Sequence, residues 1–285
     1  VLKRLGERPT PEQILELKIC DLAVGSAAFL VEACRQLGDA LVKAWHYHSN
    51  RPPLPADETE ELLARRMVAQ RCLYGVDRNP MAVDLAKLSL WLATLAKDHP
   101  FTFLDHSIRC GDSLVGLTRR QIADFHWVAT KERVFGQERI EKRIDSATNY
   151  RRNILESDDF LTPELKREKL DSADYWLNPV REAGNLVIAA FFSADKDRNR
   201  IQRRDELLTL LTQLEKDASL LPAVKESLGL LEKGRFPLLP FHWEIEFPEV
   251  FDRANSGFDA IVSNPPFAGK NTLINGNREL IVRLF

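Results

Sequence analysis

The residues of this sequence best suited to chemistry are the five from Ser263 to Phe267, which read Ser-Asn-Pro-Pro-Phe. Asn264 precedes a proline, so its backbone is biased towards extended conformations. Pro265 and Pro266 have a fixed φ angle and no backbone N–H, which leaves carbonyl oxygens and few donors at this point. An amide side chain precedes the prolines and an aromatic ring follows them. This set suits one task, which is to hold a planar amine by its two hydrogens while a ring stacks on its face.

A plain strand-ending loop is the alternative interpretation of these five residues. The apolar run 258–262 (Phe-Asp-Ala-Ile-Val) predicts a short buried strand that leads into them. Short motifs also match by chance. Three stretches upstream favour the chemical interpretation, because each places an acidic side chain after a predicted strand.

The first of these stretches combines a strand, a turn of small residues and a helix. Residues 15–20 alternate in polarity and predict a strand that ends in Asp21, and apolar residues recur at helical spacing over 29–44. Small residues at 22–28, among them Gly25, let the backbone approach a ligand closely, and the start of a helix favours an anionic group. This order is typical of the cofactor-binding opening of Rossmann-like folds. An ordinary strand-to-helix turn is the alternative.

The second and third stretches each place an acid after a further strand. Residues 72–76 predict a strand that ends in Asp77, the position at which an acid binds ribose hydroxyls in Rossmann-like sites. Residues 107–110 predict another strand shortly before Asp112. That carboxylate either reaches the adenine of a nucleoside cofactor or serves as a turn residue, and both interpretations stay open.

A leucine-rich helix is predicted directly after Asp77. Asn79 suits the N-cap, and Pro80 suits the first helical position. The helix carries a leucine stripe that we assign to the core, and Trp91 is assigned there too, with lining of the site as its alternative. The stripe consists of Leu85, Leu88, Leu92 and Leu95.

Composition narrows the class of protein. The sequence has 285 residues, of which 44% are hydrophobic and 29% charged, with a formal net charge of −2. These values are ordinary for a globular protein and show no overall basic excess, so a DNA-binding surface would be local or lie elsewhere. The four cysteines contain no C-x-x-C pair, which predicts free thiols in a reducing cytoplasm and neither a zinc site nor a disulfide framework. No signal peptide or membrane-spanning run is apparent, and the start at Val1 suggests a fragment.

The middle of the chain differs in character from both ends. Charges of both signs are interleaved there, and leucines recur at helical spacing over 207–231, which predicts a helical insertion. We therefore divide the chain into a first part of the core (1–120), an insertion (121–236) and a second part of the core with the catalytic strand (237–285). Four basic residues of the insertion are expected on a solvated helix face, with phosphate contact as the alternative: Arg198, Arg200, Arg203 and Arg204.

Together the four stretches resemble the N6-adenine DNA methyltransferases of the Eco57I-like restriction–modification class, which are type IIG-like enzymes. Residues 21–29 resemble the cofactor motif of that class, 73–83 its ribose-binding segment and 111–114 the segment at the cofactor's adenine. Residues 264–267 match its catalytic tetrapeptide. The sequence departs from the cofactor motif at Leu22, where the class has proline, and at Ala27, where it has glycine. If position 27 needs a positive φ, alanine costs about 1 kcal/mol or more there.

The resemblance implies an α/β fold with a Rossmann-like, S-adenosylmethionine-dependent methyltransferase sheet that is incomplete at the C-terminal end and carries a helical insertion. It implies a cytoplasmic enzyme of a bacterium or archaeon, active in restriction–modification or phage defence. The enzyme would methylate an adenine flipped out of double-stranded DNA, without a metal, and its recognition domain would lie outside this chain. The catalytic residues would be Asn264, Pro265, Pro266 and Phe267, and the cofactor would be bound by Asp21, Ala23, Gly25, Phe29, Asp77, Arg78, Asp112 and Ser113.

Two other functions remain open at this point. Protein glutamine methyltransferases also present Asn-Pro-Pro to a planar amide, but they usually continue with tyrosine where this chain has Phe267. A non-catalytic remnant or scaffold is the second alternative, favoured by the alanine at position 27. Methylation assays on plasmid DNA and on protein distinguish a DNA methyltransferase from a protein glutamine methyltransferase. A test of cofactor binding by the folded chain distinguishes an enzyme from a non-catalytic remnant.

Overall fold

The computed structural model describes residues 1–54, 58–95, 103–129, 136–157, 162–214, 217–233 and 237–265. These residues form two compact units that alternate along the chain. The first unit comprises Val1–Gly111, Tyr150–Asp171 and the stretch from Glu249 onward, and the second comprises Asp112–Asn149 and Ser172–Pro248. Residues 150–171 of the predicted insertion thus belong to the first unit. The domain division itself stays a prediction.

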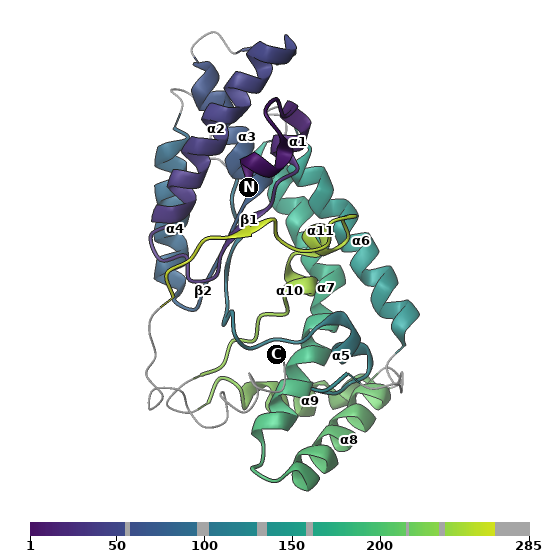
Figure 1. Ribbon diagram of the computed structural model, residues 1–285. Helices are drawn as coiled ribbons and strands as arrows, with labels where there is room; N and C mark the ends of the chain where they lie inside the picture. The colour runs from purple at the N-terminus through teal and green to yellow at the C-terminus, as the bar shows by residue number, and fades with distance from the viewer. Residues whose placement is uncertain are drawn as a thin grey trace. The chain divides into compact units, whose positions relative to one another are not determined.

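A four-stranded parallel sheet forms the centre of the first unit (Figure 1). Its strands are β1 (Ile19–Asp21), β2 (Leu73–Asp77), β3 (Ile108–Cys110) and β4 (Ala260–Ile261), in the order β3-β2-β1-β4. Ile19 of β1 pairs with Leu73 of β2 on one side and with Ala260 of β4 on the other. All pairings are parallel, so the four carboxyl ends share one edge of the sheet. This is the Rossmann-like α/β arrangement that was predicted. The strand predicted as buried over 258–262 comprises only Ala260–Ile261, and Ile261 is 58% exposed.

Local sequence signals set the helix boundaries of the first unit. Thr10 begins α1 (Pro11–Leu15) with a capping box, and Thr59 begins α3 (Glu60–Cys72) by accepting the Leu62 N–H. Asn79 accepts the Met81 N–H at the start of α4 (Pro80–Ala93), as predicted. In addition, α2 spans Ala28–His48 and packs against α3 and α4, and η1 (Leu2–Leu5) is a short 3₁₀ helix.

The first predicted strand was placed too early. Residues 15–18 were predicted as strand, but Leu15 ends α1 and the strand begins at Ile19. The alternation of polarity there is real but follows a helical turn, because the capping box at Thr10 and the proline at position 11 start a helix that ends four residues before the strand.

The prediction that the leucine stripe of α4 is core was wrong. Its four members are 44–57% exposed: Leu85, Leu88, Leu92 and Leu95. The face that packs inward carries Val83, Ala86 and Leu90 instead, each at most 4% exposed. Both sets recur at helical spacing, so periodicity alone did not distinguish them. The inward face packs against the sheet and α2.

A buried ion pair joins two returning segments of the chain to the sheet. Arg151 of α6 (Gln137–Leu155) donates to both carboxylate oxygens of Glu249, at 2.6 and 2.9 Å, from α11 (Pro248–Phe251). Tyr74 of β2 donates its hydroxyl to the same carboxylate at 3.2 Å. Burial alone raises the pKa of Glu249, but the Arg151 guanidinium outweighs it, so the pKa lies below its ordinary value.

The second unit is built of helices around an apolar core. Its elements include α5 (Arg119–Ala123), α8 (Asp197–Leu214), η2 (Ala218–Leu220), α9 (Leu221–Gly229), α10 (Trp243–Glu246) and much of α6 and α7 (Pro163–Phe192). Phe191 and Trp127 pack edge to face in the core, with ring centroids 5.5 Å apart. The helical character predicted for the insertion is confirmed. No described helix is long and apolar enough to cross a membrane.

The four arginines of the insertion do not share one environment. Arg198 is exposed, as expected of a solvated face. Arg200 is only 3% exposed, which makes that prediction wrong for this residue. Its guanidinium lies 4.1 Å from the ring centre of Phe191, and it donates to the Ala194 carbonyl at 2.7 Å. The arginine completes the end of the core because its planar head can stack on the ring while its N–H groups find carbonyl partners.

Substitution on α4 tests which of its faces is core. Leu90→Ala should lower the free energy of unfolding by about 2–5 kcal/mol, since Leu90 is fully buried. Leu92→Ala should change it by less than about 0.5 kcal/mol, since this side chain is already 57% exposed. The two changes have the same helix propensity cost, so urea denaturation reports burial alone. Equal losses for both variants would contradict the assignment.

The stability of the chain should fall between neutral and mildly acidic pH. Burial, and then Arg151, lower the pKa of His106 from 6.5 to about 4, and burial lowers that of His242 to about 4. Both rings are neutral in the folded chain, and the unfolded chain binds more protons between pH 6.5 and 4. The free energy of unfolding is therefore highest above pH 6.5 and decreases as the pH falls from 6.5 to 4. Urea denaturation at a series of pH values measures the slope.

The slope can be assigned to a residue by comparing variants. His106→Asn should flatten it, because one of the two buried rings no longer titrates. His48→Asn, which changes an exposed ring, is the matched control. An unchanged slope in the His106 variant would refute the assignment.

Candidate functional site

The carboxyl ends of β1 and β4 meet where the direction of strand order reverses. From β1 the chain proceeds to β2 and β3 on one side, whereas β4 lies on the other side. Ligands of open parallel sheets bind in the crevice at such a switch point, because the two outgoing loops diverge there. The loops that leave this point are the predicted cofactor turn after Asp21 and the segment Ser263–Asn264 after β4 (Figure 1).

Asp21 joins these two loops directly. Its side chain is buried, and Oδ1 accepts the Ala23 N–H at 3.0 Å and the Ser263 hydroxyl at 2.8 Å. One carboxylate oxygen therefore fixes the start of the turn after β1 and the first residues beyond β4. The structure thus brings together Asp21 and the residue next to the predicted catalytic Asn264.

The turn after β1 has a positive φ at position 27, where this sequence has alanine and the family motif has glycine. Gly25 has φ +51° and Ala27 has φ +62°, both in the left-handed region. Ala27 is fully buried, and its N–H donates to the Val24 carbonyl at 2.7 Å. Position 27 therefore does need a positive φ, and the turn carries alanine there in a conformation that favours glycine.

Asp77 holds the same turn from the neighbouring strand. Its Oδ2 accepts the Gly25 N–H at 3.0 Å, and its Oδ1 accepts the Asn79 N–H at 2.9 Å. An ionised carboxylate has about four acceptor positions, so two such bonds leave capacity for a diol. A glycine at position 75 of β2 lets the turn pack closely, because a Cβ there would lie 2.8 Å from Val24 Cγ2.

Negative charge at the strand ends also affects Cys110. Burial raises the pKa of the Cys110 thiol at the end of β3, and the carboxylates of Asp77 and then Asp84 raise it further. The edge therefore suits a ligand that presents positive charge or hydroxyl donors to these carboxylates, and it disfavours an anion beside them.

The remaining predicted residues lie in different settings. Asn264 and Pro265 are exposed beyond β4, while Pro266 and Phe267 lie outside the described residues. Ala23 is half-buried in the turn, and Arg78 is exposed next to Asp77. Phe29, in the first turn of α2, is 50% exposed.

Asp112 and Ser113 belong to the second unit. Asp112 donates its N–H to the Leu239 carbonyl at 2.7 Å, and its Oδ1 accepts the Leu114 N–H at 3.2 Å. The Ser113 carbonyl accepts the Trp243 ring N–H at 3.1 Å. The carboxylate thus makes the contact of a turn residue, which was one of its two interpretations. A contact with a cofactor stays a prediction for both residues.

Comparison with known proteins decides the family. The sequence model described as Eco57I restriction-modification methylase matches residues 71–281, which is most of the chain. The chain belongs to the Eco57I restriction-modification methylase family. The match includes β2, β4 and the segment with Asn264, and it begins after the turn at Asp21.

Two curated relatives of this Eco57I-family chain are much longer than it is. One is named as a candidate type II restriction enzyme and methyltransferase of Methanocaldococcus jannaschii, and is 27% identical over 301 residues, covering 95% of this chain and 24% of that protein. The other is a type II restriction enzyme and methyltransferase of Escherichia coli, 29% identical over 116 residues, covering 36% of this chain and 12% of that protein. The chain thus spans a quarter or less of either relative. No solved structure matches it.

Sequence reasoning on this Eco57I-family chain missed the role of Ser263. The residue was recognised as part of the motif but was given no contact of its own. Its partner Asp21 lies 242 positions earlier, so only the adjacency of β1 and β4 reveals the pair. The sequence carried no signal for this pair, because the pair follows from strand order, which the whole fold determines.

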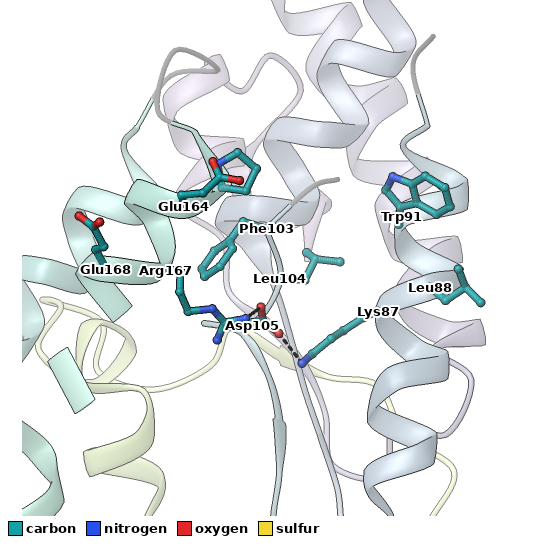
Figure 2. Close-up of a pocket in the computed structure, with 10 residues that line it drawn as sticks. Lys87, Leu88, Trp91, Phe103, Leu104, Asp105, Glu164, Arg167 and Glu168 are labelled. Atoms are coloured by element: carbon teal, nitrogen blue, oxygen red, sulfur yellow. Dashed lines mark hydrogen bonds and ion pairs between the residues drawn. The ribbon is translucent and has the colours of Figure 1, made fainter. Parts of the chain in front are cut away.

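A pocket of about 660 Å³ lies elsewhere on the first unit (Figure 2). Figure 2 shows Asp105 between Lys87 and Arg167, and it pairs with both. Lys87 and Arg167 are therefore both paired with Asp105, and none of the predicted site residues is among the described residues that line the pocket. Trp91, which is half-buried, lines this pocket together with Lys87, Leu88, Phe103, Asp105 and Arg167.

The strained turn gives a test at Ala27. Ala27→Gly relieves about 1 kcal/mol of backbone strain but loses a buried methyl group worth about 0.8 kcal/mol, so the free energy of unfolding should change by less than about 1 kcal/mol. Ala27→Val should lower it by about 2 kcal/mol or more, because a β-branched residue is strained at this φ and overfills the site. Chemical denaturation measures both. Ala28→Val, at an exposed helical position, is the control and should cost less than about 1 kcal/mol.

Proposed function

We propose that this chain is the catalytic part of an adenine-N6 DNA methyltransferase that uses S-adenosylmethionine and acts in restriction–modification. The observation that carries the proposal is the Asp21–Ser263 hydrogen bond at the switch point. It places the predicted cofactor turn beside the segment with Asn264, which is the arrangement that a transfer between two bound molecules requires. Membership of the Eco57I family supports the same activity.

The chemistry of the strand ends fits S-adenosylmethionine. The cofactor carries a sulfonium, an ammonium and a ribose with two vicinal hydroxyls, which are positive groups and hydrogen-bond donors, and one carboxylate, which the start of α2 would favour. The turn offers two carboxylates from neighbouring strands, Asp21 and Asp77, and the backbone between them is held open by small residues. Asp77 would bind the ribose hydroxyls with its remaining acceptor positions, and Asp21 would lie towards the amino-acid portion. When bound, the cofactor would supply the electrophilic methyl group and leave as the neutral thioether S-adenosylhomocysteine, while the methylated nitrogen gives one proton to solvent.

The residues of this chain would act mainly on the adenine. The amino nitrogen of adenine is a poor nucleophile because its lone pair is delocalised into the ring. The side-chain oxygen of Asn264 and the carbonyl oxygen of Pro265 would accept its two hydrogens, which favours a pyramidal nitrogen with its lone pair free to attack. Both residues are exposed beyond β4, so a base can reach them. Fixed acceptors of this kind stabilise developing positive charge without reorganising.

The substrate and the biological setting belong to the same proposal. The base would be flipped out of double-stranded DNA, because its amino group is otherwise paired inside the duplex. Phe267 would stack on the flipped base, a contact for which alanine substitution typically costs about 1–3 kcal/mol. The cytoplasm of a bacterium or archaeon is the expected location, where such an enzyme meets DNA.

Substitution of Asn264 tests the assigned chemistry. Asn264→Ala should reduce methyl transfer by about 100- to 1,000-fold, because a fixed acceptor that acts on the transition state is lost. The affinity for S-adenosylmethionine should stay within about threefold of the parent value, since this residue is assigned to the base and not to the cofactor. Calorimetric titration measures the affinity, and mass spectrometry of N6-methyladenine in unmethylated plasmid DNA measures the transfer. Asn50→Ala, at an exposed position, is the control.

The outcomes distinguish the proposal from its alternatives. An Asn264 variant that methylates adenine at the parent rate would refute the catalytic assignment. Methylated glutamine in protein instead of methylated adenine would favour the protein glutamine methyltransferase. A well-folded parent chain that binds neither S-adenosylmethionine nor its demethylated product would favour the non-catalytic remnant. Asp77→Asn should weaken cofactor binding at least about tenfold, whereas Asp84→Asn, an exposed acid nearby, should not.

A further inference from the structure

We infer that Ser263 is a positioning residue that couples the cofactor turn to the catalytic segment through Asp21. The inference rests on the proposed function, and it assigns a role to a residue that neither touches the reacting atoms nor belongs to the tetrapeptide 264–267. Its basis is the 2.8 Å hydrogen bond from the Ser263 hydroxyl to Asp21 Oδ1.

The coupling matters because β4 is very short. Its described ladder with β1 comprises two paired residues and ends with the Val262 N–H, which donates to the Cys20 carbonyl at 2.9 Å. Asn264 comes two residues later. The Ser263 hydroxyl therefore extends the attachment of this segment beyond the end of the ladder, immediately before the residue whose orientation the proposed chemistry needs.

A second side chain attaches β4 to the sheet at its other end. Asp259 accepts the Lys18 N–H at 2.8 Å with Oδ2, and Asn255 donates to its Oδ1 at 2.7 Å. The start of β4 is thus fixed independently of Ser263. Loss of the Ser263 hydroxyl should consequently loosen the exit of the strand, including the Val262–Cys20 hydrogen bond, and leave its entrance in place.

Asp21 Oδ1 accepts hydrogen bonds from both loops, so its contact with Ser263 couples the two loops. Asp21 Oδ1 accepts from Ser263 and also from the Ala23 N–H at 3.0 Å, within the turn assigned to the cofactor. A movement of this carboxylate therefore alters a hydrogen bond in each of the two loops. A cofactor bound to this turn would restrain the carboxylate, and the segment with Asn264 would be restrained with it.

Three variants test the inference: Ser263→Ala, Ser263→Thr and the control Ser256→Ala. Ser256 lies in the same unit and donates its hydroxyl to the Phe251 carbonyl at 2.8 Å, so it controls for the loss of a serine hydrogen bond. In Ser263→Ala, amide hydrogen exchange in residues 262–264 should accelerate about tenfold, as expected when a bond to a charged acceptor is lost. Exchange in the parent, Ser263→Thr and Ser256→Ala chains should agree.

The kinetic readout separates positioning from structural support. In Ser263→Ala, kcat for adenine methylation should fall about tenfold while the calorimetric Kd for S-adenosylmethionine changes less than about threefold, and Ser263→Thr should restore kcat. An unchanged kcat and exchange rate in Ser263→Ala, or an equal loss in Ser256→Ala, would overturn the inference. If the parent chain neither binds the cofactor nor methylates adenine, the proposed function fails, and the exchange comparison still decides whether Ser263 holds the segment.

Discussion

The site depends on the pairing of β1 with a parallel strand on each side. Ile19 and Cys20 pair with β2 in one direction and with β4 in the other, so the end of β1 lies in the middle of the edge where the outgoing loops diverge. A shift in register of one residue would turn Asp21 to the opposite face of the sheet. Its carboxylate would then lose both the Ala23 N–H and the Ser263 hydroxyl. A strand of three residues thus determines where the two loops meet.

Features set by interactions between residues close in the sequence could be predicted, whereas features set by contacts between distant segments could not. The strand predicted over 72–76 and ending in Asp77 lies at 73–77, and the N-cap at Asn79 is confirmed, because the signals of both lie within a few residues. The inward face of α4 was not predicted correctly. Leu88 and Leu90 both belong to apolar sets at helical spacing, and only the contacts of α4 with the rest of the fold decide which set is buried. Asp21 and Asp77 could be placed after strands, but their partners could not. Those hydrogen bonds depend on which strands are neighbours, and strand order is a property of the whole fold.

The turn after β1 shows how strain is kept at a site. Ala27 has a positive φ, which costs an alanine about 1 kcal/mol or more. The conformation persists because the surroundings determine it: the Val24 N–H donates to the Val76 carbonyl at 3.0 Å, and the Ala27 carbonyl accepts the first helical bond of α2 at 2.8 Å. Strained residues gather at ligand sites for this reason, so the outlier supports a binding role for the turn. It also means that the alanine at position 27 does not by itself prevent the turn from forming.

The position of β4 beside β1 depends on residues that are distant from it in the sequence. The segment with Asn264 reaches the sheet only after Glu249, and Glu249 is buried against Arg151 and Tyr74. Removing one partner of a buried ion pair leaves an uncompensated charge and typically costs about 3–5 kcal/mol, whereas the intact pair contributes little net stability. The pair therefore disfavours arrangements in which only one of the two returning segments docks. Arg151 and Glu249 are buried together, so the docking of α11, which leads into β4, is coupled to the docking of the C-terminal part of α6.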